Sequence, residues 1–310
     1  MKAPEDGIEL VLGQTGYPER VAKLSDAPQR LYVRGNLAAL ETSALSIVGS
    51  RRATPYGLAL AEMAARAAAQ SGIAVVSGGA IGCDQAAGRA ALKSGGCHIV
   101  VLGTGADVVY PPSAGDLIDR TIETGGAIVS LEPWGTGPRP WAFPKRNRVI
   151  AALSQALFVT EAGMPSGTFS TAETAFALGR EVLAAPGSIL SPQSRGSNDL
   201  IANGACCIVD SDSLEMAISR IYGTLCFSRS PAPGMPGLDA RGRRALAALT
   251  ANPLRIEELA TSLCADTMAV MHLLGALEAA GLVERLPDGR WSPSKRALHA
   301  LTPLGDNRRD

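Results

Sequence analysis

The sequence of 310 residues has few of the side chains that most often build metal and catalytic centres. It contains three histidines, His98, His272 and His299, which are scattered singly, and no cysteine pair with metal-ligand spacing among its six cysteines. A metal site is therefore not expected, and no disulfide framework is indicated. We expect no enzyme, because no GxSxG turn and no nucleophile beside a histidine is visible.

Long apolar runs are also missing. No stretch approaches the roughly 20 residues that a bilayer requires, and the N-terminus shows no apolar signal segment. We therefore expect a cytoplasmic protein without a membrane partner. Acidic and basic side chains balance at a net charge of +0, so any anion-binding surface has to come from local placement of charge. A hydrophobic content of 46% supplies material for a large core.

The N-terminal two thirds alternate short apolar runs with glycine turns and helical patterns. Uninterrupted apolar runs of this kind are typical of parallel strands buried on both faces, so we predict a doubly wound, mostly parallel α/β sheet. The expected strands lie at 44–48, 73–76, 98–102, 127–130 and 156–159.

A basic stretch at 141–154 stands out from this pattern. Lys145, Arg146 and Arg148 lie within four residues of one another beside Phe143, and no acidic residue occurs between Glu132 and Glu161. Pro144 suits the first turn of a helix, whose positive end favours anions. The simpler interpretation is a solvated basic turn.

Four turns should meet at one edge of the sheet, since the carboxyl ends of parallel strands open there. Their glycines would allow backbone N–H groups to approach an anion, so we predict a phosphate-binding surface. Neither glycine turn has dinucleotide or P-loop spacing, and doubly wound geometry alone also requires such turns. The predicted contacts are Gly49, Ser50, Arg51, Ser77, Gly78, Gly79, Lys145, Arg146, Arg148, Ser166 and Gly167.

A second, smaller domain is predicted at the C-terminus. We expect the first domain at 1–226, a linker rich in Pro, Gly and Ser at 227–237, a winged-helix domain at 238–300 and a tail at 301–310. Its third helix, at 266–280, contains no Lys or Arg, which argues against reading duplex DNA. Met268, Met271, Leu274 and Leu277 are expected in its core; a partner surface bearing methionine is the alternative.

Several dispersed motifs resemble the DNA-processing protein A family, also called the Smf family. VGSRRATPYG at 48–57 is similar to its VGSRxxTxYG signature, and FPKRNRVIAALS at 143–154 is similar to FPxRNRxIAxLS. Shorter matches follow in the family's order, from Glu161-Ala162 through Pro186-Gly187 to 194–205. The resemblance covers nearly the whole chain.

The resemblance implies an extended Rossmann-like domain that binds single-stranded DNA, protects incoming strands during natural transformation and loads the RecA recombinase. It also implies a homodimer. Carried over to this chain, the resemblance makes Arg51, Lys145, Arg146 and Arg148 phosphate contacts and Phe143 the base-stacking platform, with Glu161, Ser166 and Gly167 shaping the same pocket. Three positions depart from the family's SGxARGID and AH pattern, where this chain has Ile81, Cys83 and Gly88. A basic contact at Ile81 would be lost.

Two other functions remain open. Ser166-Gly167-Thr168 followed by Glu173 partly resembles the PGGxGTxxE turn of nucleoside monophosphate hydrolases, although Gly163-Met164-Pro165 replaces the first part. A nucleotide sensor with a winged-helix output is the third possibility.

Overall fold

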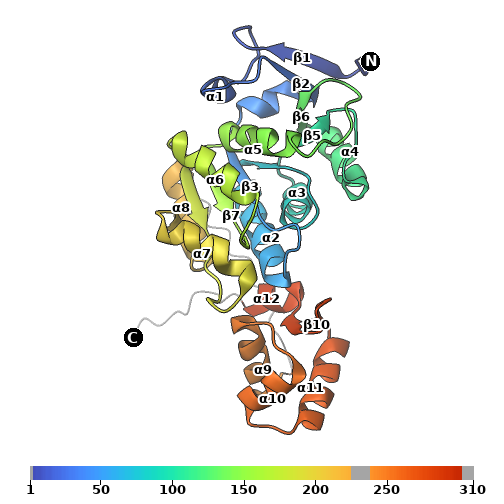
Figure 1. Ribbon diagram of the computed structural model, residues 1–310, viewed down its shortest axis with the longest axis vertical. Coiled ribbons are helices and arrows are strands. Elements are labelled where there is room, and N and C mark those ends of the chain that lie inside the picture. Colours follow the sequence, from blue (N-terminus) through green and yellow to red (C-terminus); the bar gives the residue numbers. More distant parts are fainter. Residues whose placement is uncertain (1–2, 225–237, 302–310) are drawn as a thin grey trace.

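The chain forms an α/β domain and a smaller helical domain, seen in Figure 1 as the upper and lower parts of the molecule. The computed structural model describes residues 3–224 and 238–301. The expected linker at 227–237 and most of the expected tail lie outside these residues. The domain boundaries therefore remain predictions.

The α/β domain is built on a sheet in the order β1-β2-β6-β5-β4-β3-β7-β8-β9. The seven neighbouring strands β6, β5, β4, β3, β7, β8 and β9 run parallel. At the other edge, β2 pairs antiparallel with β6, and β1 pairs antiparallel with β2. The prediction of a mostly parallel sheet is confirmed. The strands are β1 Gly7–Val11, β2 Arg30–Gly35, β3 Ala44–Val48, β4 Ala74–Ser77, β5 His98–Gly105, β6 Ala127–Glu132, β7 Ala156–Val159, β8 Glu181–Ala184 and β9 Cys206–Cys207.

Helices cover both faces of this sheet (Figure 1). One face packs against α5 and α6, and the opposite face packs against α2, α3 and α8. Small side chains such as Ala61, Ala64 and Ala68 are fully buried on α2 and let it lie close to the sheet. The helices are α1 Glu19–Ala22, α2 Pro55–Gln70, α3 Cys83–Lys93, α4 Gly115–Glu123, α5 Ala142–Leu153, α6 Thr168–Ala177, α7 Arg195–Ala202 and α8 Ser211–Tyr222.

The C-terminal domain has the predicted winged-helix architecture, three helices followed by a short hairpin. Its elements are α9 Ala240–Ala251, α10 Ile256–Leu263, α11 Thr267–Ala279, β10 Val283–Arg285, β11 Trp291–Pro293 and α12 Lys295–Leu301. Leu274 and Leu277 are buried in its core, as expected. The expectation for the methionines was wrong, because Met268 and Met271 are 57% and 48% exposed on the outer face of α11.

The last helix, α12, joins the two domains. It packs against α2, and Lys295 Nζ lies 2.6 Å from Glu62 Oε1. Figure 1 shows α12 between the end of α2 and the rest of the winged-helix domain. This contact places a C-terminal lysine beside the α/β domain, at a position that local sequence patterns could not reveal.

Within the described residues, no single helix combines the length and apolarity needed to cross a membrane. Only α10 and α11 taken together meet that test, and they are bent by 106° relative to each other.

Candidate functional site

The four predicted turns meet at the carboxyl ends of β3, β4 and β7. They line a cavity of about 450 Å³, which we call the Arg51 pocket. Its lining comes from the turn after β3, the turn before α3, the face of α5 and the turn before α6: Gly49, Ser50, Arg51, Arg52, Ala80, Asp84, Arg146, Asn147, Ser166, Gly167 and Thr168, with Val48, Ile150, Gly163, Pro165 and Thr171 around them. The geometry thus brings together four segments that are distant in the sequence.

Arg146 holds two of these segments together from the inside. Its side chain is almost fully buried, and Nη1 donates hydrogen bonds to the carbonyl oxygens of Gly78, at 2.5 Å, and Val101, at 2.6 Å. Burial lowers the pKa of Arg146 to about 10, and the nearby carboxylate of Asp84 opposes this shift. The guanidinium remains charged at neutral pH and is largely committed to the fold.

Asp84 is a buried acid whose charge interacts with that of this arginine. Its Oδ2 accepts a hydrogen bond from the backbone N–H of Gly78 at 3.0 Å. Burial raises the pKa of Asp84, while Arg146 and the backbone donors lower it. The turn between them has no room for a side chain, because a Cβ on Gly78 would lie 1.8 Å from Arg146 Nη1. Gly78 is therefore required for close approach, and Gly79, at φ +68°, for its backbone conformation.

Arg51 and Arg52 are the exposed cations among the described residues that line the pocket. The guanidinium carbon of Arg51 lies 5.4 Å from the ring centroid of Phe143, and that of Arg146 lies 5.9 Å from the same centroid. Phe143 is half-buried, packed against Gly103, and its ring is 5.8 Å from that of Tyr110. Arg51 is thus held over an aromatic ring with its charge open to solvent.

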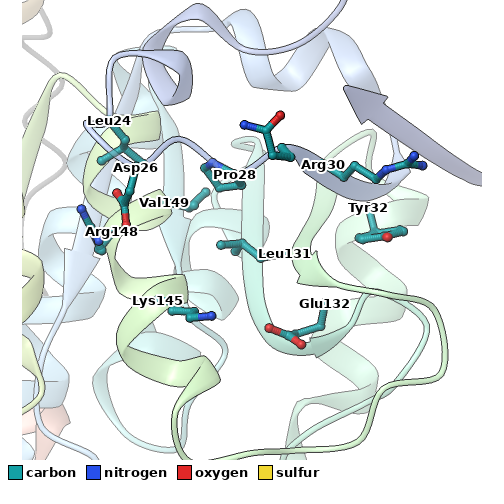
Figure 2. A pocket seen from close by; sticks show the side chains of 11 residues that line it. Leu24, Asp26, Pro28, Arg30, Tyr32, Leu131, Glu132, Lys145, Arg148 and Val149 are labelled. Atoms are coloured by element: carbon teal, nitrogen blue, oxygen red, sulfur yellow. Dashed lines mark hydrogen bonds and ion pairs between the residues drawn. The ribbon is translucent and has the colours of Figure 1, made fainter. Parts of the chain in front are cut away.

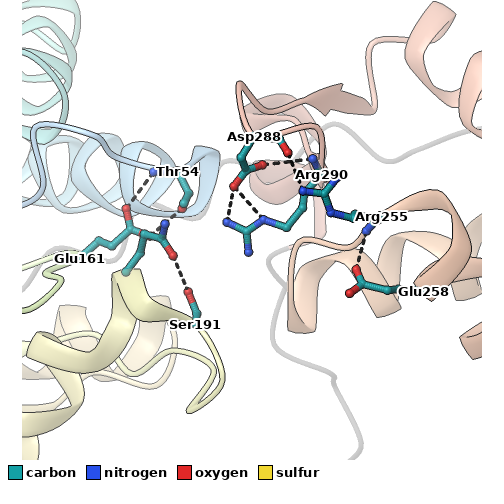
Figure 3. A network of polar contacts seen from close by, with 8 residues as sticks. Thr54, Glu161, Ser191, Arg255, Glu258, Asp288 and Arg290 are labelled. Atoms are coloured by element: carbon teal, nitrogen blue, oxygen red, sulfur yellow. Dashed lines mark hydrogen bonds and ion pairs between the residues drawn. The ribbon is translucent and has the colours of Figure 1, made fainter.

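Glu161 fixes the turn that carries Arg51 (Figure 3). Its two carboxylate oxygens accept hydrogen bonds from the backbone N–H of Thr54, at 2.8 Å, and from Thr54 Oγ1, at 2.7 Å. Burial raises the pKa of Glu161, and the hydrogen bonds from Thr54 lower it. Because Thr54 is the N-cap of α2, this contact ties the β3–α2 turn to the end of β7.

Two further residues predicted as phosphate contacts, Lys145 and Arg148, lie elsewhere. Figure 2 shows them in a separate cavity of about 380 Å³, together with Asp26 and Glu132. Arg148 forms an ion pair with Asp26. Lys145 and Arg148 are three residues apart and share one helix face, whereas Arg146 points to the sheet. The expected cluster of all three cations with Arg51 is not present.

The remaining predicted residues differ in how far their side chains can reach a ligand. Ser77 is fully buried, and its hydroxyl lies 3.0 Å from His98 Nε2, so its side chain belongs to the core. Gly49 packs against Thr160 and Cys83, where a Cβ would be 2.4 Å from Thr160 Oγ1. Ser166 and Gly167 lie at the start of α6, where Ser166 Oγ accepts a hydrogen bond from the N–H of Thr168.

The departures from the family pattern have structural explanations. A Cβ on Gly88 would lie 2.5 Å from the ring of His98, so a larger side chain could not occupy this position beside that histidine. Cys83 is buried against Gly49. Ile81 is 55% exposed, so the position of the missing basic contact is an apolar surface.

The sequence interpretation overlooked Trp141, which is 46% exposed at the start of α5. Lys145 Nζ lies 4.6 Å from its ring centroid, and the guanidinium carbon of Arg139 lies 5.7 Å from it. Trp141 is therefore a more exposed aromatic ring than the half-buried Phe143. Trp141 stands inside the basic stretch at 141–154, and this position is the sequence signal that could have identified it.

Two chemical alternatives gain no support from the geometry. Across residues 3–224 and 238–301, no group of three potential ligands among His, Cys, Asp and Glu could hold a metal ion. Glu173, the residue that partly resembled a hydrolase acid, is exposed on α6 and is not among the described residues lining the Arg51 pocket.

Comparison with known proteins gives two family matches. Residues 9–219 match the family described as DNA recombination-mediator protein A, and residues 229–289 match the DprA winged helix domain.

Curated relatives agree with these matches. Protein Smf of Escherichia coli is 38% identical over 198 residues, which cover 64% of this chain but only 53% of that protein, about half its length. The putative DNA processing protein DprA of Mycobacterium tuberculosis H37Rv is 37% identical over 280 residues, covering 89% of this chain and 72% of the relative.

Two solved structures are similar in fold. DprA from Streptococcus pneumoniae matches with a TM-score of 0.63 at 36% identity, covering 68% of this chain and 74% of that one. DNA processing protein A from Helicobacter pylori, whose structure concerns its single-stranded DNA binding mode, matches with a TM-score of 0.62 at 29% identity, covering 68% and 96%.

Proposed function

The chain belongs to the DNA recombination-mediator protein A family, and from that premise we propose that it binds single-stranded DNA in the Arg51 pocket. The observation that carries the proposal is the meeting of four turns, among them the start of α6, at a pocket lined by the exposed Arg51 and Arg52. Helix starts and glycine turns present backbone N–H groups to phosphate oxygens. The single-stranded DNA binding described for the Helicobacter pylori relative supports the same assignment.

The proposed roles divide between contact and positioning. Arg51 contacts a phosphate directly, and the backbone at Gly49, Ser50, Ser166 and Gly167 adds N–H donors. Arg146 shapes the pocket by fixing the Gly78–Gly79 turn. Phe143 and the more exposed Trp141 offer ring faces on which bases stack, an interaction that does not depend on sequence. Lys145 and Arg148 line the separate cavity and would meet a strand that leaves the Arg51 pocket along α5.

The expected affinity of one chain is moderate. Each phosphate contact contributes about −0.7 to the slope of log affinity against log salt concentration. Three or four contacts therefore give a slope of about −2 to −3. Base stacking adds about 1 to 3 kcal/mol for each base. Two chains acting together would strengthen binding without new chemistry, which suits the homodimer that we propose.

The experiment is a fluorescence anisotropy titration with a labelled oligo-dT strand. Arg51→Ala should weaken binding about 5-fold or more in about 0.1 M salt and reduce the salt slope by about 0.7, because one phosphate contact is lost. Arg243→Ala, which removes an exposed arginine from α9, is the matched control and should bind like the parent protein. An Arg51→Ala protein with unchanged thermal unfolding and full affinity would refute the pocket.

We also propose the family's cellular role for this chain: protection of incoming strands in the cytoplasm during natural transformation and loading of the RecA recombinase. A nuclease challenge of bound oligo-dT tests protection, and RecA assembly on coated strands tests loading. If bound strands are degraded as fast as free ones, protection is refuted. No gain in RecA assembly would refute loading.

The homodimer has its own structural support. Ile189 and Leu190 are 86% and 78% exposed on the loop between β8 and α7, which is unusual for neighbouring large apolar side chains unless a partner covers them. Analytical ultracentrifugation should give twice the chain mass, and Leu190→Asp should shift the protein toward monomer. A monomeric parent protein would contradict the dimer.

A further inference from the structure

A second, larger cavity adjoins the Arg51 pocket. It has a volume of about 800 Å³ and lies along α2 and α3, with Lys295 of α12 at its edge. Arg51 and Arg52 line both cavities, so the two form a continuous surface around the β3–α2 turn. We call this second cavity the α2–α3 groove.

The charge of the groove is strongly one-sided. Six cations line it, and Glu62 is the only carboxylate among the described lining residues. The cations are Arg51, Arg52, Arg66, Arg89, Lys93 and Lys295. Lys295 pairs with Glu62, and Arg89 pairs with Asp116 outside the groove. In a chain whose net charge is +0, this concentration of cations is a local feature.

Apolar side chains line the groove together with the cations, and we call them its floor. They are Ala53, Leu58, Ala86, Ala90 and Ile81, of which Ile81 exposes 55% of its surface. A surface that combines cations with apolar side chains suits an unpaired strand, whose phosphates face the cations and whose bases lie on the floor. In duplex DNA the faces of the bases are stacked on one another, so they could not contact the apolar side chains of the groove.

We propose that a single DNA strand continues from the Arg51 pocket into the α2–α3 groove, with Lys93 and Lys295 as phosphate contacts and Ile81 beneath a base. This proposal rests on the proposed function, since it extends the same strand. It also assigns a role to the winged-helix domain. Its helix α11 carries no Lys or Arg, and the domain contributes to the groove through Lys295 of α12.

The test compares two strand lengths. Site sizes of single-strand binders range from about 4 to 16 nucleotides, so labelled dT of about 6 and about 16 nucleotides samples the pocket alone and the pocket with the groove. Lys93→Gln with Lys295→Gln removes two contacts, worth about 0.7 log units each in about 0.1 M salt. The 16-mer should bind about 25-fold more weakly, with a salt slope smaller by about 1.4, while the 6-mer should bind as to the parent protein.

Two controls keep the outcomes distinct. Lys23→Gln with Arg243→Gln removes the same charge at exposed positions outside the groove and should change neither affinity. Lys93→Gln alone leaves the contact between Lys295 and Glu62 intact and should weaken 16-mer binding about 5-fold. That result would separate loss of a phosphate contact from displacement of the winged-helix domain.

Three results would overturn the proposal. In the first, the groove variants bind the 16-mer like the charge-matched control while Arg51→Ala still loses affinity; the proposed function then stands and the groove does not bind the strand. In the second, both lengths weaken equally. In the third, a 16-base-pair duplex binds the parent protein more tightly than the single strand and shows the same dependence on Lys93. If the parent protein binds neither length, the proposed function falls with the groove.

Discussion

Replacing Arg146 by Met tests whether this residue organises the pocket. The change keeps the length of the side chain but removes the charge that faces Asp84 and the hydrogen bonds to the carbonyls of Gly78 and Val101. Breaking a buried charge pair by removing one partner costs about 3 to 5 kcal/mol, because the other charge remains buried without compensation. We expect a loss of that size in the free energy of unfolding of the α/β domain.

Urea unfolding followed by circular dichroism measures this loss, with Arg148→Met as the matched control. Arg148 pairs with Asp26 at the surface, where such pairs contribute about 0 to 1 kcal/mol. Adding Asp84→Asn to Arg146→Met should recover part of the stability, because the uncompensated charge is then gone. If Arg146→Met costs no more than the Arg148 control, Arg146 is not an anchor and our interpretation of the pocket is wrong.

The pH dependence of the Arg146→Met variant has a definite sign. Burial raises the pKa of Asp84 in the folded protein above its unfolded value, and removing Arg146 would raise it further. The folded state therefore binds a proton more readily than the unfolded state, so the variant gains relative stability as pH falls and loses it as pH rises. The deficit against the parent protein should be larger at pH 8 than at pH 5.

Three further predictions follow from single positions. Gly78→Ala should abolish oligo-dT binding, since its Cβ would lie 1.8 Å from Arg146 Nη1; Gly137→Ala, where nothing lies within 4 Å, is the matched control, and equal anisotropy titrations would contradict the steric argument. Burial lowers the pKa of His98 to about 3, so its unfolded form takes up a proton first and stability falls as pH drops below about 6.5. Between pH 7.5 and pH 5 the parent protein should lose about 2 kcal/mol more than His98→Gln in urea unfolding, and equal losses would exclude a buried neutral imidazole. Trp141→Ala should weaken oligo-dT binding by about 1 to 3 kcal/mol if a base stacks on this ring, and parent-like affinity would remove Trp141 from the site.

Much of the fold follows from sequence periodicity. The parallel strands β3 to β7 were predicted because each is an apolar run, as in the fully buried run of β3, and their parallel direction placed the following turns at one edge. The parallel strand β8 was not predicted. The paired edge strand β1 was missed, because its pairing with β2 depends on contacts that no local pattern encodes. The contact between Lys295 and Glu62 spans 233 positions and was invisible for the same reason.

The candidate site was predictable as a set of turns but not as a set of side chains. The basic stretch of α5 identified the right helix, yet Arg146 faces the sheet while Lys145 and Arg148 lie in another cavity. On a helix, the side chains at 145 and 148 lie on one face, and the side chain at 146 points to a different face. The sequence alone could therefore have predicted that Arg146 is separated from Lys145 and Arg148. The burial of Ser77 against His98 was not, since it depends on how β4 and β5 align in the sheet.

Amide hydrogen exchange with and without a 16-nucleotide oligo-dT strand tests directly whether DNA binds in the Arg51 pocket. We expect binding to slow exchange in the peptides that cover 49–52 and 166–168, because phosphates accept hydrogen bonds from those turns. Binding of the strand with unchanged exchange in both peptides would show that the DNA lies elsewhere on the protein.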